Sequence, residues 1–332
     1  MLTPKQNFIE TVRGGNPDRF VKQFEFVAMP YSDPFNATNN YPIEPIEEGL
    51  PDLWGVTWCW PEGTPGAFPL HGDGLTVLPG DDIENWRDYV KAPPLEYSEE
   101  LWQAAEADYA TYDRDEVLVG PIMFPGLFEH LHALMGMEDA LCAMYENPDE
   151  VHEIIEQALD WEIDYLKQMA KRLHPDAVVH HDDWGSAKST FFSTDMFEEF
   201  FLDPYKRLYK AYHDNGYEFV IHHSDSYAAT FVPYMIEIGV DVWQGGTDLN
   251  DIPALVKQYG GQISFLTGID NSICDVEDWT PELVANRVRE MCEKCGKQYF
   301  MPCQTAQMTE STYDGVYEAA DKAIDMMSAE MF

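Results

Sequence analysis

The chain has 332 residues, 45% of them hydrophobic and 14% aromatic, which is enough to bury the core of one large α/β barrel or of two ordinary domains. Its 60 acidic and 20 basic residues give a formal net charge of -40, so we expect neither nucleic acid nor an anionic membrane as a partner. No run of 18 or more apolar residues is present, and the start "MLTPKQNFIETVRGG" lacks the pattern of a secretory leader, so we expect a cytoplasmic protein.

Nothing in the sequence marks a domain boundary, because no internal repeat, low-complexity tract or Gly/Ser linker is present. We therefore expect residues 1–332 to form a single barrel domain. The six cysteines are spread too thinly for a disulfide scaffold, so they are expected as thiols or as one or two metal ligands. Residues 30–94 are rich in Pro, Gly, Trp and Asp, and predict long loops around short strands.

Short apolar runs alternate with helical patterns from residue 115 onward. These runs end near Ile122, His181, His223, Trp243, Thr267 and Pro302. With "RFVKQFEFVAM" and "GVTWCW" as first and second strands, they make eight strand-helix units. The pattern predicts an α/β fold, a (β/α)8 TIM barrel with an irregular, loop-rich N-terminal region. No GxGxxG follows an early strand, which disfavours a dinucleotide-binding fold.

Several helices carry clear start signals. Thr3 and Thr280 are candidate N-caps, each followed by a proline, and Asn147 precedes Pro148 in the same way. A further helix is expected to begin near Ser193 and to end at "HDNG".

Polar side chains concentrate where a barrel places its working groups, at the C-terminal ends of the strands. The positions are Glu25, Glu129 with His130 and His132, residues 180–183, residues 222–225, Gln244, Asp270 and Cys303. The sequence thus predicts a site at this end of the barrel.

Metal binding is the most economical interpretation of one part of this set. His223 and Asp225 lie two residues apart after the fifth strand, and Cys303 follows the eighth, so three ligand-type side chains would converge and leave a fourth position open. The alternative to a metal site is that His223 and Asp225 are hydrogen bonded to each other within a loop. Whether His222 or His223 faces the site depends on the strand register, since neighbouring residues point to opposite faces.

The stretch "VVHHDDWG" provides a second cluster. We assign catalytic roles to His181, Asp182 and Asp183, whose side chains would carry protons or orient a metal-bound imidazole; the alternative for the carboxylates is a helix cap within a hydrogen-bonded loop. Substrate contacts are assigned to Glu25, Glu129, Trp184, Gln244 and Asp270. "CEKC" at residues 292–295 is expected to be structural, and "EHLH" is not expected to bind metal as a pair, because residues two apart on a helix face different ways.

The stretch from "HHDDWGSAKSTFF" through "VIHHSDSYAAT" to "VDVWQGG", preceded by "LFEHLHALMGMEDA" and followed by "ISFLTGID" and "YFMPCQ", resembles the uroporphyrinogen decarboxylase superfamily over about residues 115–325. The resemblance implies a β/α barrel. It also implies one of two activities: cofactor-free decarboxylation of a tetrapyrrole, or methyl transfer to or from a corrinoid carried by a separate protein, with zinc in the barrel.

Residues of this chain favour the second activity, methyl transfer, over decarboxylation. Decarboxylases of the family carry an arginine-rich segment after the first strand, whereas "KQFEFVAMPYSDPF" contains no arginine, so an octacarboxylate substrate is disfavoured. The family's zinc methyltransferases show H-x-C after the fifth strand and a cysteine after the eighth. By this resemblance His223 and Cys303 match the outer ligands, and Asp225 replaces the middle cysteine. A carboxylate there would favour activation of an ether or amine.

The expected function is therefore a zinc-dependent methyltransferase that moves a methyl group from a small O-methyl or N-methyl substrate to a corrinoid (cobalamin) on a partner protein. Trp54, Trp58 and Trp60 would wall an aryl methyl ether or a quaternary ammonium, or would simply pack an irregular cap. Two alternatives stay open: a metal-free decarboxylase or lyase acting on a smaller acid, and a barrel that binds a corrinoid or a partner without turnover. The sequence leaves the direction of transfer and the oligomeric state open.

Overall fold

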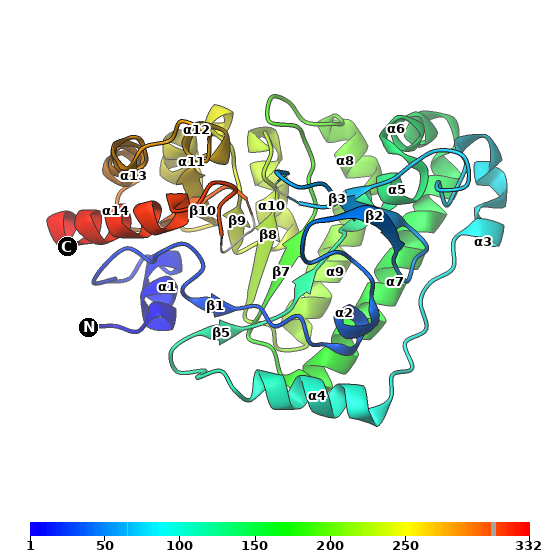
Figure 1. The fold of residues 1–332 in the computed structure, drawn as a ribbon, viewed down its shortest axis with the longest axis horizontal. Coiled ribbons are helices and arrows are strands. Elements are labelled where there is room, and N and C mark those ends of the chain that lie inside the picture. The colour runs from blue at the N-terminus through cyan, green and yellow to red at the C-terminus, as the bar shows by residue number, and fades with distance from the viewer. Residues whose placement is uncertain (65, 307–309) are drawn as a thin grey trace.

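The computed structural model describes residues 1–64, 66–306 and 310–332. Its centre is a six-stranded parallel sheet in the order β11-β10-β9-β8-β7-β6 (Figure 1). The strands are β6 (Ile122–Met123), β7 (Ala177–His181), β8 (Phe219–His223), β9 (Val242–Gln244), β10 (Ser264–Ile269) and β11 (Phe300–Gln304). These are the short apolar runs that the sequence predicts, and the α/β class with a parallel sheet is confirmed.

Two further strands form a separate parallel pair beside this sheet. β1 (Val27–Ala28) pairs with β5 (Leu118–Val119). The backbone N–H of Asp176, just before β7, donates to the carbonyl of Val119 at 2.7 Å, and the N–H of Gln23 donates to the carbonyl of Pro302 in β11 at 3.3 Å. These bonds connect the pair to the edge strand β11 and to the segment before β7, the strand next to the other edge, as a barrel requires.

Helices flank the strands, and several begin as the sequence predicts. The Thr3 side chain accepts from Gln6 N in a capping box, and the Thr280 side chain accepts from Leu283 N at 3.1 Å. The helix expected from Ser193 onward is interrupted at Phe201. The α-helices are α1 (Pro4–Val12), α2 (Pro34–Thr38), α3 (Trp86–Tyr89), α4 (Glu99–Tyr109), α5 (Leu127–Met135), α6 (Met137–Glu146), α7 (Pro148–Leu173), α8 (Thr194–Phe200), α9 (Leu202–Asp214), α10 (Val232–Ile238), α11 (Ile252–Tyr259), α12 (Asn271–Cys274), α13 (Pro281–Cys295) and α14 (Val316–Met331). Short 3₁₀ helices cover Gly80–Asn85, Ala229–Phe231 and Asp248–Asn250.

One predicted strand is placed differently. "GVTWCW" does not join the parallel sheet; it forms β3 (Thr57–Trp60), the middle strand of an antiparallel sheet with β2 (Ile46–Pro51) and β4 (Phe68–Pro69). The N-terminal region is therefore a small sheet with loops. It packs on α5 and on the chain after β6 through Trp54, whose ring lies 4.3 Å from that of His130, and Trp58, whose ring lies 5.2 Å from that of Phe124.

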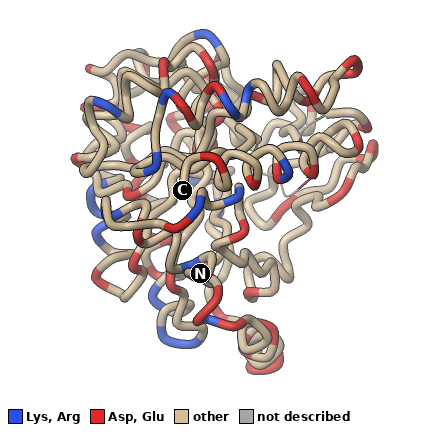
Figure 2. The backbone as a smooth tube through the Cα atoms, turned by 90° about the vertical axis from the view of Figure 1, so that its left-hand side faces the viewer, with Lys and Arg blue, Asp and Glu red and all other residues tan. Residues whose placement is uncertain are grey.

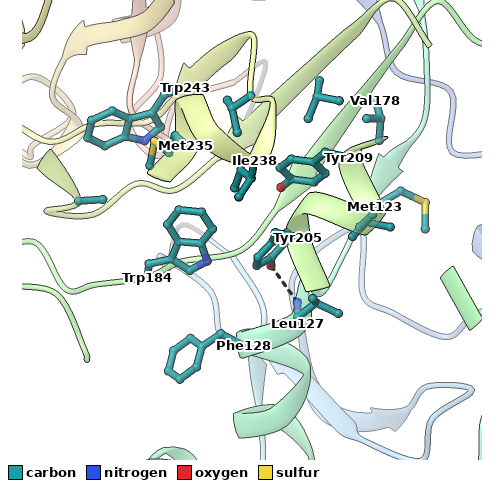
Figure 3. Close-up of a cluster of buried hydrophobic side chains, with 14 of the residues drawn as sticks. Met123, Leu127, Phe128, Val178, Trp184, Tyr205, Tyr209, Met235, Ile238 and Trp243 are labelled. Atoms are coloured by element: carbon teal, nitrogen blue, oxygen red, sulfur yellow. Dashed lines mark hydrogen bonds between the residues drawn. The ribbon is translucent and has the colours of Figure 1, made fainter. Parts of the chain in front are cut away.

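Two apolar clusters fill the interior. Inward side chains of β7, β8, β9, β10 and β11, among them Val179, Ile221 and Leu266, pack with Phe8 and Phe26. A larger cluster joins the outer faces of the strands to the helices, and Figure 3 shows part of it around Trp184 and Tyr205. Within the described residues no helix combines the length and apolarity needed to cross a bilayer.

Candidate metal centre

The paired histidines at the ends of β7 and β8 settle which imidazole faces the interior. His180 is paired with His222, and His181 with His223. The interior cluster contains Val179 and Ile221, two residues before His181 and His223, so these two histidines share the inward face because side chains alternate along a strand. Their ring centroids lie 4.3 Å apart.

One group of ligand-type side chains stands out at this position. His181, Asp183 and His223 each present a ligand atom, and these atoms all lie within 4.8 Å of one another. It is the one such group found among the described residues. His181 and Asp183 are half-buried and His223 is buried, so the group is open toward solvent on the β7 side.

The imidazole of His223 is oriented from behind by Gln244. The Gln244 amide donates to the carbonyls of Gln304 at 2.9 Å and Thr305 at 3.1 Å, so its Oε1 remains to accept a hydrogen bond from Nδ1 of His223. This tautomer leaves the lone pair of Nε2 free. Burial lowers the pKa of His223 well below its usual value, which keeps the ring neutral as a metal ligand must be.

Glu129 orients the imidazole of His181 in the same way, through a hydrogen bond at Nδ1. Its Oε2 lies 2.7 Å from Nδ1 of His181, at the start of α5. An Nδ1–H that donates to this carboxylate leaves Nε2 unprotonated, and burial lowers the pKa of His181. A ring nitrogen held by a carboxylate or amide oxygen is the usual arrangement behind metal-bound histidines. The residues present therefore fit a divalent metal.

Asp183 and Asp225 form an acidic pair beside the imidazoles. The backbone N–H of Asp225 donates to Oδ1 of Asp183 at 2.9 Å. Burial and the nearby Glu129 raise the pKa of Asp183 to about 7, and burial together with Asp183 raises the pKa of Asp225 well above its usual value. A bound cation would favour the ionised form of both carboxyls.

Asp182 has a different role from its neighbour. Its carboxylate accepts from the N–H groups of Phe128 at 3.1 Å and Glu129 at 2.8 Å, from Nε1 of Trp184 at 3.0 Å and from the Tyr205 hydroxyl. Asp182 thus caps the first turn of α5 and fixes the helix that carries Glu129. The carboxylate is fully buried and satisfied, so it positions the site rather than facing it.

Cys303 is not part of the group. It lies on the inward face of β11, paired with Gly268, and its side chain packs within the interior apolar cluster. Burial raises the pKa of its thiol well above the usual value, and a hydrogen bond with the Gln244 side chain opposes that rise. The predicted ligand role of Asp225 and Cys303 stays a prediction.

Three of the predicted substrate contacts lie in other surroundings. Glu25 precedes β1 and forms an ion pair with Arg19. Trp184 is fully buried among Phe197, Tyr205 and His222. Asp270 accepts from Ser272 N at 2.9 Å and caps the short helix α12.

Aromatic rings line the Glu129 and His181 side of the group. Phe124 contacts His181 edge to face, with ring centroids 4.9 Å apart, and Tyr41 lies 4.8 Å from Phe124 and 5.1 Å from Trp58. Burial, Tyr31 and Glu129 raise the pKa of the Tyr41 phenol, so its hydroxyl lies near Glu129. Tyr41, Phe124 and the buried Trp58 thus form one aromatic cluster beside His181.

The involvement of His181 had a signal in the sequence. His181 and Asp183 repeat, on the neighbouring strand, the H-x-D spacing of His223 and Asp225. Parallel strands in register bring the two H-x-D segments side by side, so the repeat predicts a four-residue cluster better than either segment does alone.

The solved structures include one that matches nearly the whole chain. A methyltransferase from Methanosarcina mazei superposes with a TM-score of 0.66 at 12% sequence identity, over 98% of this chain and 99% of that one. A D-psicose 3-epimerase from Clostridium cellulolyticum H10, solved with D-tagatose, reaches a TM-score of 0.42 at 9% identity, over 76% of this chain and 87% of that one. No curated protein matches the sequence.

A family model matches the sequence directly. It is described as uroporphyrinogen decarboxylase (URO-D), and it spans residues 126–302, which is more than half of the chain and includes α5, β7, β8 and β10. The resemblance seen in the sequence motifs is therefore confirmed. The chain belongs to the uroporphyrinogen decarboxylase family.

Proposed function

We propose that this protein is a metal-dependent methyltransferase that moves a methyl group from a small O-methyl or N-methyl substrate to a corrinoid on a partner protein. The observation that carries the proposal is the group of His181, Asp183 and His223, with Glu129 and Gln244 behind the imidazoles. The full-length likeness to a methyltransferase supports the same class.

The donor set suits zinc. Two imidazole nitrogens and one carboxylate oxygen are borderline ligands, and three protein ligands leave an open position for a substrate atom. Bound there, the metal would act as a Lewis acid on the heteroatom that carries the methyl group. Asp225 would hold or release a proton beside that atom, and Glu129 and Gln244 would keep both rings in the required tautomer.

Decarboxylation of a polycarboxylate fits these residues poorly. No lysine or arginine forms an ion pair with Glu129, Asp183 or Asp225 within the described residues, which include every lysine and arginine of the chain. A substrate with several carboxylates would bring further negative charge to a buried acidic site without a cation to balance it.

Metal analysis of the purified protein tests the proposal first. We expect about one divalent ion per chain and loss of that ion in His181→Ala and His223→Ala. Methylcob(III)alamin formation from cob(I)alamin and a panel of methyl donors, followed by visible absorbance, then tests transfer. Protein without metal whose activity ignores chelators would overturn the proposal.

A further inference from the structure

A groove with a volume of about 1120 Å³ opens on the side of the fold that carries both chain ends (Figure 1). Its lining comes from the loop after α1, from α11, from the end of α13 and the turn before β11, and from Phe332. Tyr299 of this lining directly precedes β11, so the groove lies at the strand starts, whereas the candidate metal centre lies at the strand ends. Pockets for small molecules commonly measure about 300–1,000 Å³, so a ligand of nucleotide size has room here.

Tyr299 forms part of the groove wall and has an unusual backbone conformation. Its φ is 63°, in the left-handed region that tyrosine seldom adopts. Its N–H donates to the carbonyl of Thr11 at 3.0 Å, and its carbonyl accepts from the N–H of Phe265 at 2.8 Å. A Cβ at Gly14 or at Gly260 would overlap the Tyr299 side chain, so both glycines allow the ring to lie where it does. Conformations of this kind persist where surrounding contacts enforce them, and they are frequent at ligand sites.

Three lysines line the groove, although the chain has only 20 basic residues against 60 acidic ones. Lys294 pairs with Glu290 at 2.6 Å. Lys257 and Lys297 are exposed, and neither forms an ion pair within the described residues, which include every aspartate and glutamate of the chain. Nζ of Lys297 lies 4.6 Å from the ring centroid of Phe332. Two cations at the groove are therefore left without a counter-charge.

The negative charge at the groove does not balance these lysines. Asp18 is the one acidic side chain of the lining, and the carboxyl group of Phe332 is the other anion. The Asp18 carboxylate accepts from the N–H of Leu2 at 2.7 Å and from the Asn7 amide at 2.9 Å, and it lies 3.9 Å from the ammonium group of Met1. Figure 2 faces this side of the molecule and shows basic positions close to the C-terminus among acidic ones. An unbalanced positive charge attracts an anion.

Rings and apolar side chains complete the lining. Phe332 is 40% exposed and Tyr299 is half-buried, so part of each ring is accessible from the groove. Pro17 and Pro253 add apolar surface. The Gln298 amide is occupied, because it donates to two carbonyls of the loop after α1 at 3.1 and 2.8 Å. A bare anion would use the lysines alone, whereas an anion that carries a ring would use both kinds of surface.

We propose that this groove binds a small organic phosphate of about nucleotide size, with its phosphate groups at Lys257 and Lys297 and a planar ring near Tyr299 and Phe332. Lysine binds phosphate as a point charge on a flexible stem, so two exposed lysines suit a diphosphate without a rigid cradle. The proposal goes beyond the methyl transfer proposed above and uses none of its residues, because the groove lies at the opposite end of the sheet.

Binding of ADP, without added magnesium, tests the proposal. Pyrophosphate and adenosine represent its two halves. We expect calorimetry to show that ADP binds at least about tenfold more tightly than either half, and that its affinity falls as salt rises. The same affinity is expected in His223→Ala, because an ion at the candidate metal centre is not involved.

Substitutions at exposed positions locate the effect. The double variant Lys257→Gln with Lys297→Gln is expected to weaken ADP and pyrophosphate at least about tenfold. Phe332→Ala is expected to weaken ADP several-fold and to leave pyrophosphate unchanged. Lys171→Gln is the control, because it makes the same charge change at an exposed lysine of α7 that does not line the groove. Circular dichroism checks the fold of each variant.

Each other outcome counts against the proposal. Unchanged ADP affinity in the double lysine variant, or its loss in His223→Ala, would place the phosphate elsewhere. Pyrophosphate that binds as tightly as ADP would make the groove a site for free phosphate and would overturn the role of the rings. Tighter binding of a polyglutamate peptide than of ADP would overturn the proposal in favour of an acidic protein segment. Metal content and methyl transfer are measured separately, so the two proposals can fail independently.

Discussion

The paired histidines at the ends of β7 and β8 face two different environments. On the helix side, Tyr209 of α9 is hydrogen bonded to Nδ1 of His180 at 3.2 Å and to Nδ1 of His222 at 2.7 Å, and the Glu162 carboxylate of α7 lies 3.2 Å from Nε2 of His180. On the inward side, Nδ1 of His181 is hydrogen bonded to Glu129 and Nδ1 of His223 to Gln244. Ligand atoms of both rings lie within 4.8 Å of one another and of a carboxylate oxygen of Asp183.

The comparison shows how the alternation of a strand divides identical residues between two tasks. Each strand ends in "HH", and the two pairs lie in register. One histidine of each pair faces the helices, and the other faces the candidate metal centre. The helix-side rings are fully buried and tie α7 and α9 to the sheet, whereas His181 keeps part of its surface exposed. Four experiments test this difference.

The largest difference is expected between His223→Ala and His222→Ala. Loss of His223 removes a ligand, so bound metal and methyl transfer should fall to background while the fold survives. Loss of His222 should leave metal binding intact and lower stability by about 2–5 kcal/mol, because it opens a buried cavity and removes the shorter of the two hydrogen bonds of the Tyr209 hydroxyl. Metal content and urea unfolding measured on both proteins check this, and metal loss in the His222 variant alone would reverse our assignment.

Removal of a residue behind a ligand should have an intermediate effect. Glu129→Ala frees Nδ1 of His181, so we expect metal affinity to fall about 10- to 100-fold. Competition with a coloured chelator measures the affinity. Glu25→Ala is the matched control, because that carboxylate pairs with Arg19 outside the group, and its metal affinity should equal that of the parent protein.

On the helix side, Tyr209→Phe should cost about 1–3 kcal/mol of unfolding free energy, because two buried imidazoles lose a partner. Its metal content should not change. Tyr234→Phe removes an exposed hydroxyl that bonds to Glu198 and serves as the control with little expected effect. An equal loss of stability in both variants would contradict a special role for the Tyr209 bridge.

The smallest effect concerns pH. Burial raises the pKa of Asp183 to about 7 in the metal-free fold. The proton on Asp183 therefore stabilises the metal-free protein fully below the ordinary carboxyl pKa of about 4, and this contribution is lost as the pH rises to about 7. Metal must displace the proton, so metal affinity should rise with pH up to about 7 and then level off. Proton release on metal binding, measured calorimetrically in two buffers, checks the sign, and Asp183→Asn should abolish the step.

Local signals predicted most of the fold. The apolar runs at residues 177–181 and 219–223 became strands at those positions, and Thr3 and Thr280 became caps, because such signals depend on nearby residues alone. "GVTWCW" has the same local character, but its partner strands run antiparallel, and no local feature distinguishes the two cases.

The site was predictable in part. Its location at the strand ends and the identity of His223 and Asp183 as polar candidates followed from the fold class. The inward position of His181 required the register between β7 and β8. The orientation of His223 depends on Gln244, which comes from a third strand and also bonds to the carbonyls of Gln304 and Thr305. Contacts among three distant segments leave no trace in spacing.

Gln244 also links the candidate metal centre to the end of β11. Its side chain joins His223 at the end of β8 to the carbonyls of Gln304 and Thr305 at the end of β11, the strand that receives the N-terminal segment through Gln23. If a bound ion orders His223, we therefore expect the order to extend through Gln244 to the end of β11 and to Gln23. Amide protons around Gln304 should exchange more slowly once the ion is loaded, although none of them lies on a ligand.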